Sequence, residues 1–143
     1  MPIANYTTTV KQLKTIGEIQ SMLVEHGVSS ISIDYAEKQP AALYFIAEIN
    51  FQSVPFRLPS KWEGVLQAMK RDSNVPKRYC VEDQARRVAW RITRDWVRAQ
   101  LAIIEAGQVS LGEVFLPYAV NSDGQTVYEL FSQKGFAALA PAK

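Results

Sequence analysis

Residues 81–106 read VEDQARRVAWRITRDWVRAQLAIIEA, a stretch without proline or glycine that is followed by Gly107. Such a stretch predicts one long helix that ends at the glycine. At about 100° per residue, one apolar set lies on one side and forms the expected core face: Val81, Ala85, Val88, Ile92, Trp96, Ala99 and Ile103. A second apolar set lies on a different side: Trp90, Val97, Leu101 and Ile104. The helix is therefore expected to contact two layers of the protein or a second subunit, which makes a homo-oligomer one expectation.

The remaining side of this helix is basic. Its arginines follow i, i+4, i+7, i+11 spacing and form one stripe: Arg87, Arg91, Arg94 and Arg98. Like charges at this spacing repel by about 0.2–0.5 kcal/mol per pair, so something has to offset them. Three explanations stay open at this point. The stripe is solvated or neutralised by acids of the same helix, Asp83 and Asp95, or it binds an anion, or it contacts another subunit.

As an anion site, the arginine stripe suits phosphate, because planar guanidinium groups bind phosphate oxygens bidentately. Trp90 or Tyr79 would then stack on a base. Arg57 lies on an expected edge strand and contributes only if the fold brings it near the stripe. The predicted ligand-binding residues are Arg57, Tyr79, Arg87, Trp90, Arg91, Arg94 and Arg98.

Helix starts are marked by Ser or Thr followed three residues later by Glu, the capping-box pattern. It occurs at four places: Thr15–Glu18, Ser60–Glu63, Ser110–Glu113 and Thr126–Glu129. The first helix is expected to end after His26, at Gly27. His26, the one histidine, should then interact with the last carbonyls of that helix.

Between the first two helices the apolar period changes to two, as in strands. Apolar and polar residues alternate in 31–35, and residues 42–49 suggest a more buried central strand. A tight connection at 50–52 leads to a third strand around Pro55, and the proline marks this strand as an edge. Residues 6–10 could add another strand. The expected fold class is α+β: a small antiparallel meander with an N-terminal helix, followed by a long helix and shorter C-terminal helices. All of it fits one domain, residues 1–143.

Composition narrows the function. The chain has 143 residues, 48% of them hydrophobic, and a formal net charge of +2. Residues 61–98 hold ten Lys or Arg against five acids, a net charge of +5, so the remainder carries −3. This unevenness favours a local anion site over a surface coated in positive charge for DNA.

Several site chemistries are excluded. One cysteine, Cys80, cannot build a disulfide framework or a cysteine-rich zinc site. Asp123, in the turn 121–124, lacks the alternating oxygen ligands of a calcium loop, so neither a metal nor a cofactor is expected. The chain has no Gly-x-Ser-x-Gly elbow, Walker loop or dinucleotide fingerprint, which favours a non-catalytic protein. No signal peptide or membrane-spanning apolar run is found, and a cytoplasmic location is expected.

Three stretches carry a resemblance: Phe56-Arg57-Leu58-Pro59, Ala89-Trp90-Arg91 through Asp95-Trp96, and Phe115-Leu116-Pro117-Tyr118. With them the chain resembles a family of small bacteriophage and prophage proteins. In architecture it is similar to the first Thoeris anti-defence family. That resemblance implies an oligomer that traps cyclic ADP-ribose isomers, or cyclic oligonucleotides, and so blocks host anti-phage defence. It implies no particular site residue.

The expected function is therefore non-catalytic sequestration of a small phosphorylated nucleotide signal. The alternatives are a nucleic-acid-binding accessory protein of phage replication or recombination, and an inhibitor that binds a host protein. Nucleic acid should bind with a steep dependence on salt, since its counterions are released.

Overall fold

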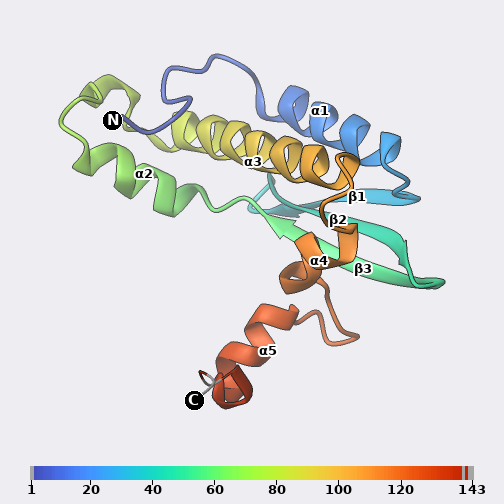
Figure 1. Ribbon diagram of the computed structural model, residues 1–143. Coiled ribbons are helices and arrows are strands. Elements are labelled where there is room, and N and C mark those ends of the chain that lie inside the picture. Colours follow the sequence, from blue (N-terminus) through green and yellow to red (C-terminus); the bar gives the residue numbers. More distant parts are fainter. Residues whose placement is uncertain (1, 140, 142–143) are drawn as a thin grey trace.

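The computed structural model describes residues 2–139 and 141. Its elements are, in chain order, α1 (Gln12–Glu25), β1 (Ser30–Ala36), β2 (Gln39–Ile49), β3 (Gln52–Pro59), α2 (Trp62–Arg71), η1 (Lys77–Tyr79), α3 (Glu82–Glu105), α4 (Leu111–Phe115), η2 (Leu116–Tyr118), α5 (Val127–Lys134) and η3 (Ala137–Leu139) (Figure 1). The expected α+β fold is confirmed, including the long helix and the shorter C-terminal helices. Within the described residues, no helix has both the length and the apolar composition needed to span a bilayer.

The three strands form an antiparallel meander in the order β1-β2-β3. Both connections are two-residue turns whose residues have positive φ, Glu37 and Lys38 in the first and Asn50 and Phe51 in the second. Turns of this kind match the twist of the strands that they join. The additional strand predicted at residues 6–10 is wrong, because this segment forms a turn followed by irregular chain. It runs beside α3 instead of joining the sheet.

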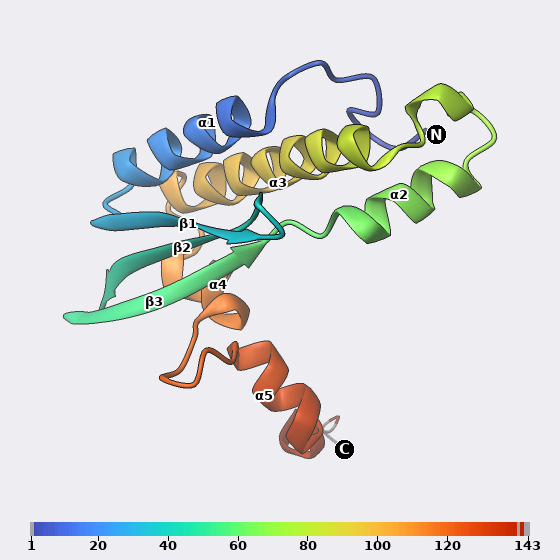
Figure 2. The same cartoon turned by 180° about the vertical axis from the view of Figure 1, so that it is seen from behind.

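Helices α1 and α3 lie side by side over one face of the sheet (Figures 1 and 2). Both contribute to one core with the strands and α4. Its largest fully buried members are Ile16, Ile19 and Leu23 of α1, Leu43, Phe45, Phe56 and Leu58 of the sheet, Trp90 and Val97 of α3, and Phe115 of α4. Phe45 and Phe56 stack across neighbouring strands with ring centroids 5.1 Å apart, and the ring of Phe115 packs edge-on against both.

The prediction of which apolar side of α3 forms the core face is wrong. The side with Trp90 and Val97 faces α1 and the sheet and is the fully buried one. Of the expected core face, only Ala85 and Val88 are buried, and they pack against α2 in a second cluster, while Val81 is 51% exposed. Its later residues are not buried, because α2 does not extend that far along α3, and Ile103 is exposed. The prediction that α3 contacts two layers is confirmed, and both layers belong to the same chain.

Two of the four predicted capping boxes form. Ser110 with Glu113 starts α4, and Thr126 with Glu129 starts α5, each with both reciprocal hydrogen bonds. The predicted end of α1 is also confirmed: Gly27 has a φ of +92°, and His26 places Nδ1 2.8 Å from the carbonyl oxygen of Met22.

The other two predicted boxes are wrong. Helix α1 begins at Gln12, so Thr15 lies inside the helix with a fully buried side chain. Helix α2 begins at Trp62 after Lys61, without any side-chain cap, and the hydroxyl of Ser60 has no hydrogen-bond partner. The pattern was present in both cases, but tertiary packing decided where the helix starts.

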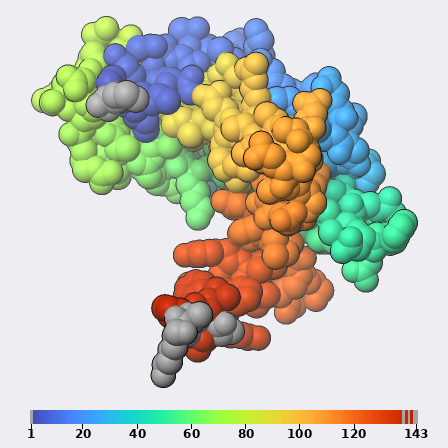
Figure 3. Space-filling view, in the orientation of Figure 1, coloured from blue at the N-terminus to red at the C-terminus, as the bar shows by residue number. Residues whose placement is uncertain are grey.

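The C-terminal segment closes the β3 edge of the sheet. The amide of Val120 donates to the carbonyl of Pro55 at 2.9 Å, and Ala119 forms a bridge with Phe56. Arg57 reaches from β3 to this segment and donates to the carbonyl of Gly124 at 2.9 Å. Beyond it, Val127 at the start of α5 packs against the main core, and the rest of the helix projects from the body of the protein (Figure 3).

Candidate functional site: a pocket at the start of α2

The arginine stripe of α3 lies along the seam with α1. Arg91 forms an ion pair with Glu18 of α1, with Nη1 2.6 Å from Oε2, and it also approaches the hydroxyl of Thr15. Arg94 pairs with the same Glu18 oxygen at 3.5 Å and with Asp95 at 3.3 Å. The side chains of Arg91 and Arg94 are only 16% and 19% exposed. Arg91 and Arg94 are therefore neutralised mainly by Glu18 of α1. The sequence-based explanation included only acids of the same helix.

The two ends of the stripe differ. Arg87 donates through Nε and Nη2 to the side-chain oxygen of Gln84. Gln84 is itself buried, and its amide nitrogen donates to the carbonyls of Tyr6 and Thr8, which holds the N-terminal segment against α3. Arg98 is exposed and has no hydrogen bond or ion pair within the described residues. One arginine of the stripe is thus left free, where four were proposed to act together.

The other predicted ligand-binding residues are dispersed. Trp90 is 1% exposed in the main core, so it cannot stack on a base without opening that core. Tyr79 packs edge-on against Tyr6 at 5.5 Å, in the second cluster. Arg57 bonds Asp34 and Gly124 on the sheet face opposite to α1 and α3. The structure does not bring these three residues and the stripe into one site.

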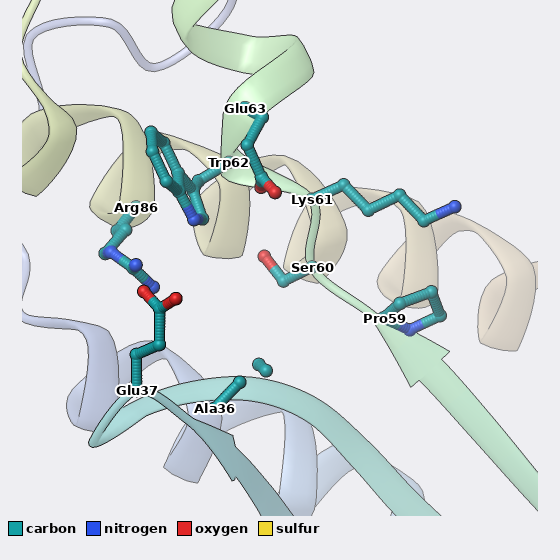
Figure 4. A pocket seen from close by; sticks show the side chains of 9 residues that line it. Ala36, Glu37, Pro59, Ser60, Lys61, Trp62, Glu63 and Arg86 are labelled. Atoms are coloured by element: carbon teal, nitrogen blue, oxygen red, sulfur yellow. The ribbon is translucent and has the colours of Figure 1, made fainter.

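A pocket lies where β3 leads into α2. It has a volume of about 330 Å³ and is bounded by the β1–β2 turn, the β3–α2 junction and the first turns of α3 (Figure 4). The polar or aromatic side chains that line it are Glu37, Ser60, Lys61, Trp62, Glu63 and Arg86. Three segments that are far apart in sequence therefore meet at one concave surface.

Arg86 is the most unusual of these residues. It is only 6% exposed, and its guanidinium carbon lies 4.8 Å from the centre of the Trp62 ring. Nε and Nη2 both lie 2.9 Å from one carboxylate oxygen of Glu82. Nη1 has no hydrogen bond within the described residues, and Figure 4 shows the guanidinium group directed into the pocket. A buried arginine with a free nitrogen is prepared to bind an anion at little cost in side-chain entropy.

The start of α2 supplies further donors beside Arg86. The first amides of a helix have no partner within the helix and carry a partial positive charge. Here no side chain caps them, and the Ser60 hydroxyl is buried without a partner. The backbone of Ser60 is fixed, because its amide donates to the carbonyl of Ala41 at 2.9 Å. Lys61 also lines the pocket, and its side chain extends away from Arg86 (Figure 4).

Two carboxylates give the pocket a mixed character. Glu37 stands on the β1–β2 turn and points across the pocket toward Arg86, while Glu63 lies in the first turn of α2 (Figure 4). A site of this kind suits a ligand with an anionic group at the helix start and hydrogen-bond donors elsewhere. This pocket is hard to recognise in the sequence, because Ser60 and Glu63 have the pattern of a capping box and Arg86 lies outside the stripe.

The pocket lacks the side chains most often used as metal ligands or nucleophilic thiols. No histidine or cysteine lines it. Within the described residues, no three His, Cys, Asp or Glu side chains lie close enough together to hold a metal ion. The pKa of Glu129 is lowered, first by the hydrogen bond from the Thr126 backbone and then by the Thr126 side chain, with smaller effects of Arg57 and Lys61. That shift reflects the capping box of α5.

Comparisons with protein-family models, curated proteins and solved structures find no match for this chain.

Proposed function

We propose that the protein is a non-catalytic binding protein for a small phosphorylated nucleotide, and that the pocket at the start of α2 holds this ligand. The observation that carries the proposal is Arg86, which is buried and braced by Trp62 and Glu82 and still has a free nitrogen in the pocket. The Arg87–Arg98 stripe is not the site of this proposal, since Glu18 already occupies its two central members.

Each part of the ligand has a counterpart in the pocket. A phosphate would accept hydrogen bonds from Arg86, from the Ser60 hydroxyl and from the first amides of α2. The carboxylates of Glu37 and Glu63 would accept from the amino groups of a base or the hydroxyls of a sugar. A volume of about 330 Å³ lies within the range of small-molecule sites.

Binding without turnover fits the lining of the pocket. The pocket has one hydroxyl, that of Ser60, and two carboxylates, but it lacks a histidine, the side chain most often used as a general base. His26 forms a hydrogen bond with the carbonyl oxygen of Met22 at the end of α1 and is not part of the pocket. Sequestration of an intact nucleotide, the function expected from the family resemblance, agrees with this lining.

Native mass spectrometry tests the proposal with a panel of cyclic nucleotides, cyclic ADP-ribose isomers and linear nucleoside phosphates. We expect a complex with one of them that releases the same mass on denaturation. Arg86→Met should abolish the complex. Lys61→Glu changes an exposed residue, and it should weaken the complex because it adds a negative charge next to the start of α2. Lys70→Glu, at the other end of α2, is the matched control.

Three results would contradict the proposal. A protein that binds nothing in the panel has no nucleotide function of this kind. A ligand released with a changed mass indicates catalysis. A complex that survives Lys61→Glu and is lost in Arg98→Glu instead places the ligand on the exposed end of the stripe.

A second candidate function, nucleic-acid binding, is favoured by the far end of α2. Four exposed cations stand there without an ion pair in the described part of the chain: Lys70, Arg71, Lys77 and Arg78. Arg78 also lies over the ring of Tyr79, at 4.8 Å. Fluorescence anisotropy with a single-stranded oligonucleotide should then show affinity that falls steeply with salt, and the Arg71→Glu variant should flatten that dependence.

A further inference from the structure

One edge of the sheet is covered by another segment of the chain, and the other edge is open. The β3 edge is covered by residues 119–120 through a hydrogen bond and a bridge. The β1 edge is open, and no hydrogen bond outside the β1–β2 ladder involves a backbone group of described residues 30–36. Its sequence, SISIDYA, has no proline and no lysine, two residues that protect edges. The ladder with β2 shifts register between Asp34 and Tyr35, but the extra residue there, Ala41, belongs to β2, so β1 itself is continuous. An edge with such a sequence is ready to pair with another strand.

The flank of α1 beside this edge carries two exposed apolar side chains. Leu13 and Val24 are 58% and 60% exposed. They are 11 residues apart, which at about 100° per residue places them on the same side of the helix. Glu18 faces α3 from the other flank of α1, so the Leu13–Val24 side is turned away from α3. Gly17 lies between them with nothing within 4 Å of the position of a Cβ atom, and so leaves room for a close approach.

We infer that this combined surface, the β1 edge and the Leu13–Val24 flank of α1, binds a second copy of the chain. The two β1 strands pair in antiparallel orientation about a two-fold axis, and the two sheets become one of six strands. Both helical layers then lie on the same face of the joined sheet, so that α1 meets the partner's α1. Such an interface is isologous, the commonest kind in homodimers.

The strand sequence is complementary to itself in one register. Overlap of all seven residues places Ile33 opposite the partner's Ile33, and Ile31 opposite the partner's Tyr35. The same register places Ser32 opposite the partner's Asp34, so no like charges meet. A shift of two residues in either direction shortens the overlap, and in one direction it also sets Asp34 against the partner's Asp34. Cross-strand pairs of apolar residues and the absence of like-charge pairs both favour the full register.

The same axis also fits the helices. Strand β1 has 7 residues and α1 has 14, so at about 3.3 Å and 1.5 Å per residue their lengths are nearly equal. An axis through Ile33, the middle of the strand, therefore passes near the middle of α1. It brings Leu13 to the partner's Val24 and Gly17 to the centre of the helix contact. Two independent features of the chain thus agree on one partner and one geometry.

Sedimentation velocity from micromolar to millimolar protein tests this interface. We expect a monomer–dimer equilibrium that is weakened by Val24→Glu and by Ser32→Asp. Ser32→Asp creates two like-charge contacts per dimer, which should raise the dissociation constant about 2- to 30-fold. Ser32→Lys places a cation opposite the partner's Asp34, and it should leave the dimer intact or strengthen it. Opposite effects at one position separate the register from a general loss of folding.

Matched controls are available on the same chain. Leu116→Glu replaces another exposed apolar side chain, 54% exposed on η2, and Ser73→Asp adds the same charge in an exposed loop. Neither should change dimerisation. A protein that stays monomeric at millimolar concentration would overturn the inference, and the edge would then be open to a strand of another protein. A dimer that is lost in Leu116→Glu but survives Val24→Glu would overturn it equally, because the interface would lie near the C-terminal helices.

Discussion

The ion pairs between α1 and α3 give the sharpest test of what the arginine stripe does. Glu18→Gln keeps the shape of the side chain and removes the charge that Arg91 and Arg94 share. Loss of one partner of a buried ion pair costs about 3–5 kcal/mol, and an exposed pair is worth about 0.2–1 kcal/mol. The arginines are 16% and 19% exposed and Glu18 is 36% exposed, so the seam lies between these cases. We expect a loss of about 1–3 kcal/mol after allowance for solvent screening.

The loss is measured by urea and thermal denaturation followed by far-UV circular dichroism. For a domain near 150 residues, 1 kcal/mol lowers Tm by about 2–4 °C, so Tm should fall by about 2–12 °C. Glu25→Gln is the matched control, since Glu25 is exposed on the same helix and forms no ion pair with another described residue. That variant should stay within about 0.5 kcal/mol of the parent, as surface substitutions usually do.

One result would refute this reasoning. If Glu18→Gln and Glu25→Gln unfold at the same urea concentration, Glu18 does not hold the arginines in solution. Arg91 and Arg94 would then be free to bind an external anion, and the stripe would return as the leading candidate site. If the Glu18→Gln variant is destabilised and still binds its ligand, the ion pairs between α1 and α3 stabilise the fold and are not part of the ligand site.

Three further predictions concern single elements. Trp90→Ala should destabilise the protein by about 3–5 kcal/mol, as loss of a fully buried aromatic side chain does, and urea denaturation measures it. Ser110→Ala removes one half of a formed capping box and should cost about 1 kcal/mol, while Ser110→Asp should cost less because it restores an acceptor. The pKa of Glu129 is lowered by folding from its ordinary value of 4.5, so its contribution to α5 is present above that value and is lost as pH falls through the folded pKa. Amide chemical shifts at the start of α5 should follow this titration, and Glu129→Gln should abolish it.

The local parts of the fold could be predicted from the sequence. Residues 82–105 form one helix because nothing in them interrupts it, and Gly107, with a φ of +75°, follows its end. The alternation around Ile31 and Ile33 identified a strand, and the short connections required an antiparallel meander. Each of these conclusions depends on residues that are close together in the chain.

What could not be predicted depends on contacts between distant segments. Glu18 and Arg91 are 73 positions apart, and the i±4 rule considers only the acids of one helix. Both apolar sides of α3 have suitable residues, and only the positions of α1, α2 and the sheet decide which side is fully buried. Arg86 could not be identified for the same reason, because its suitability as a binding residue depends on Trp62 and on the unpaired Ser60 hydroxyl.

The proposed pocket and the proposed dimer meet at one end of β1. Ala36 and Glu37 line the pocket, and Ala36 is also the last residue of the open strand. In the full register, Ala36 lies opposite the partner's Ser30, so the partner's α1–β1 loop comes next to the pocket wall. If the ligand contacts this loop, ligand binding and dimerisation are coupled, and the coupling is reciprocal. A ligand that contacts this loop would tighten the dimer by the same factor by which the dimer tightens the ligand. A ligand that extends only as far as Glu37 would leave the dissociation constants of the dimer and of the ligand unchanged. The dependence of ligand affinity on protein concentration therefore shows whether the ligand reaches the β1 edge.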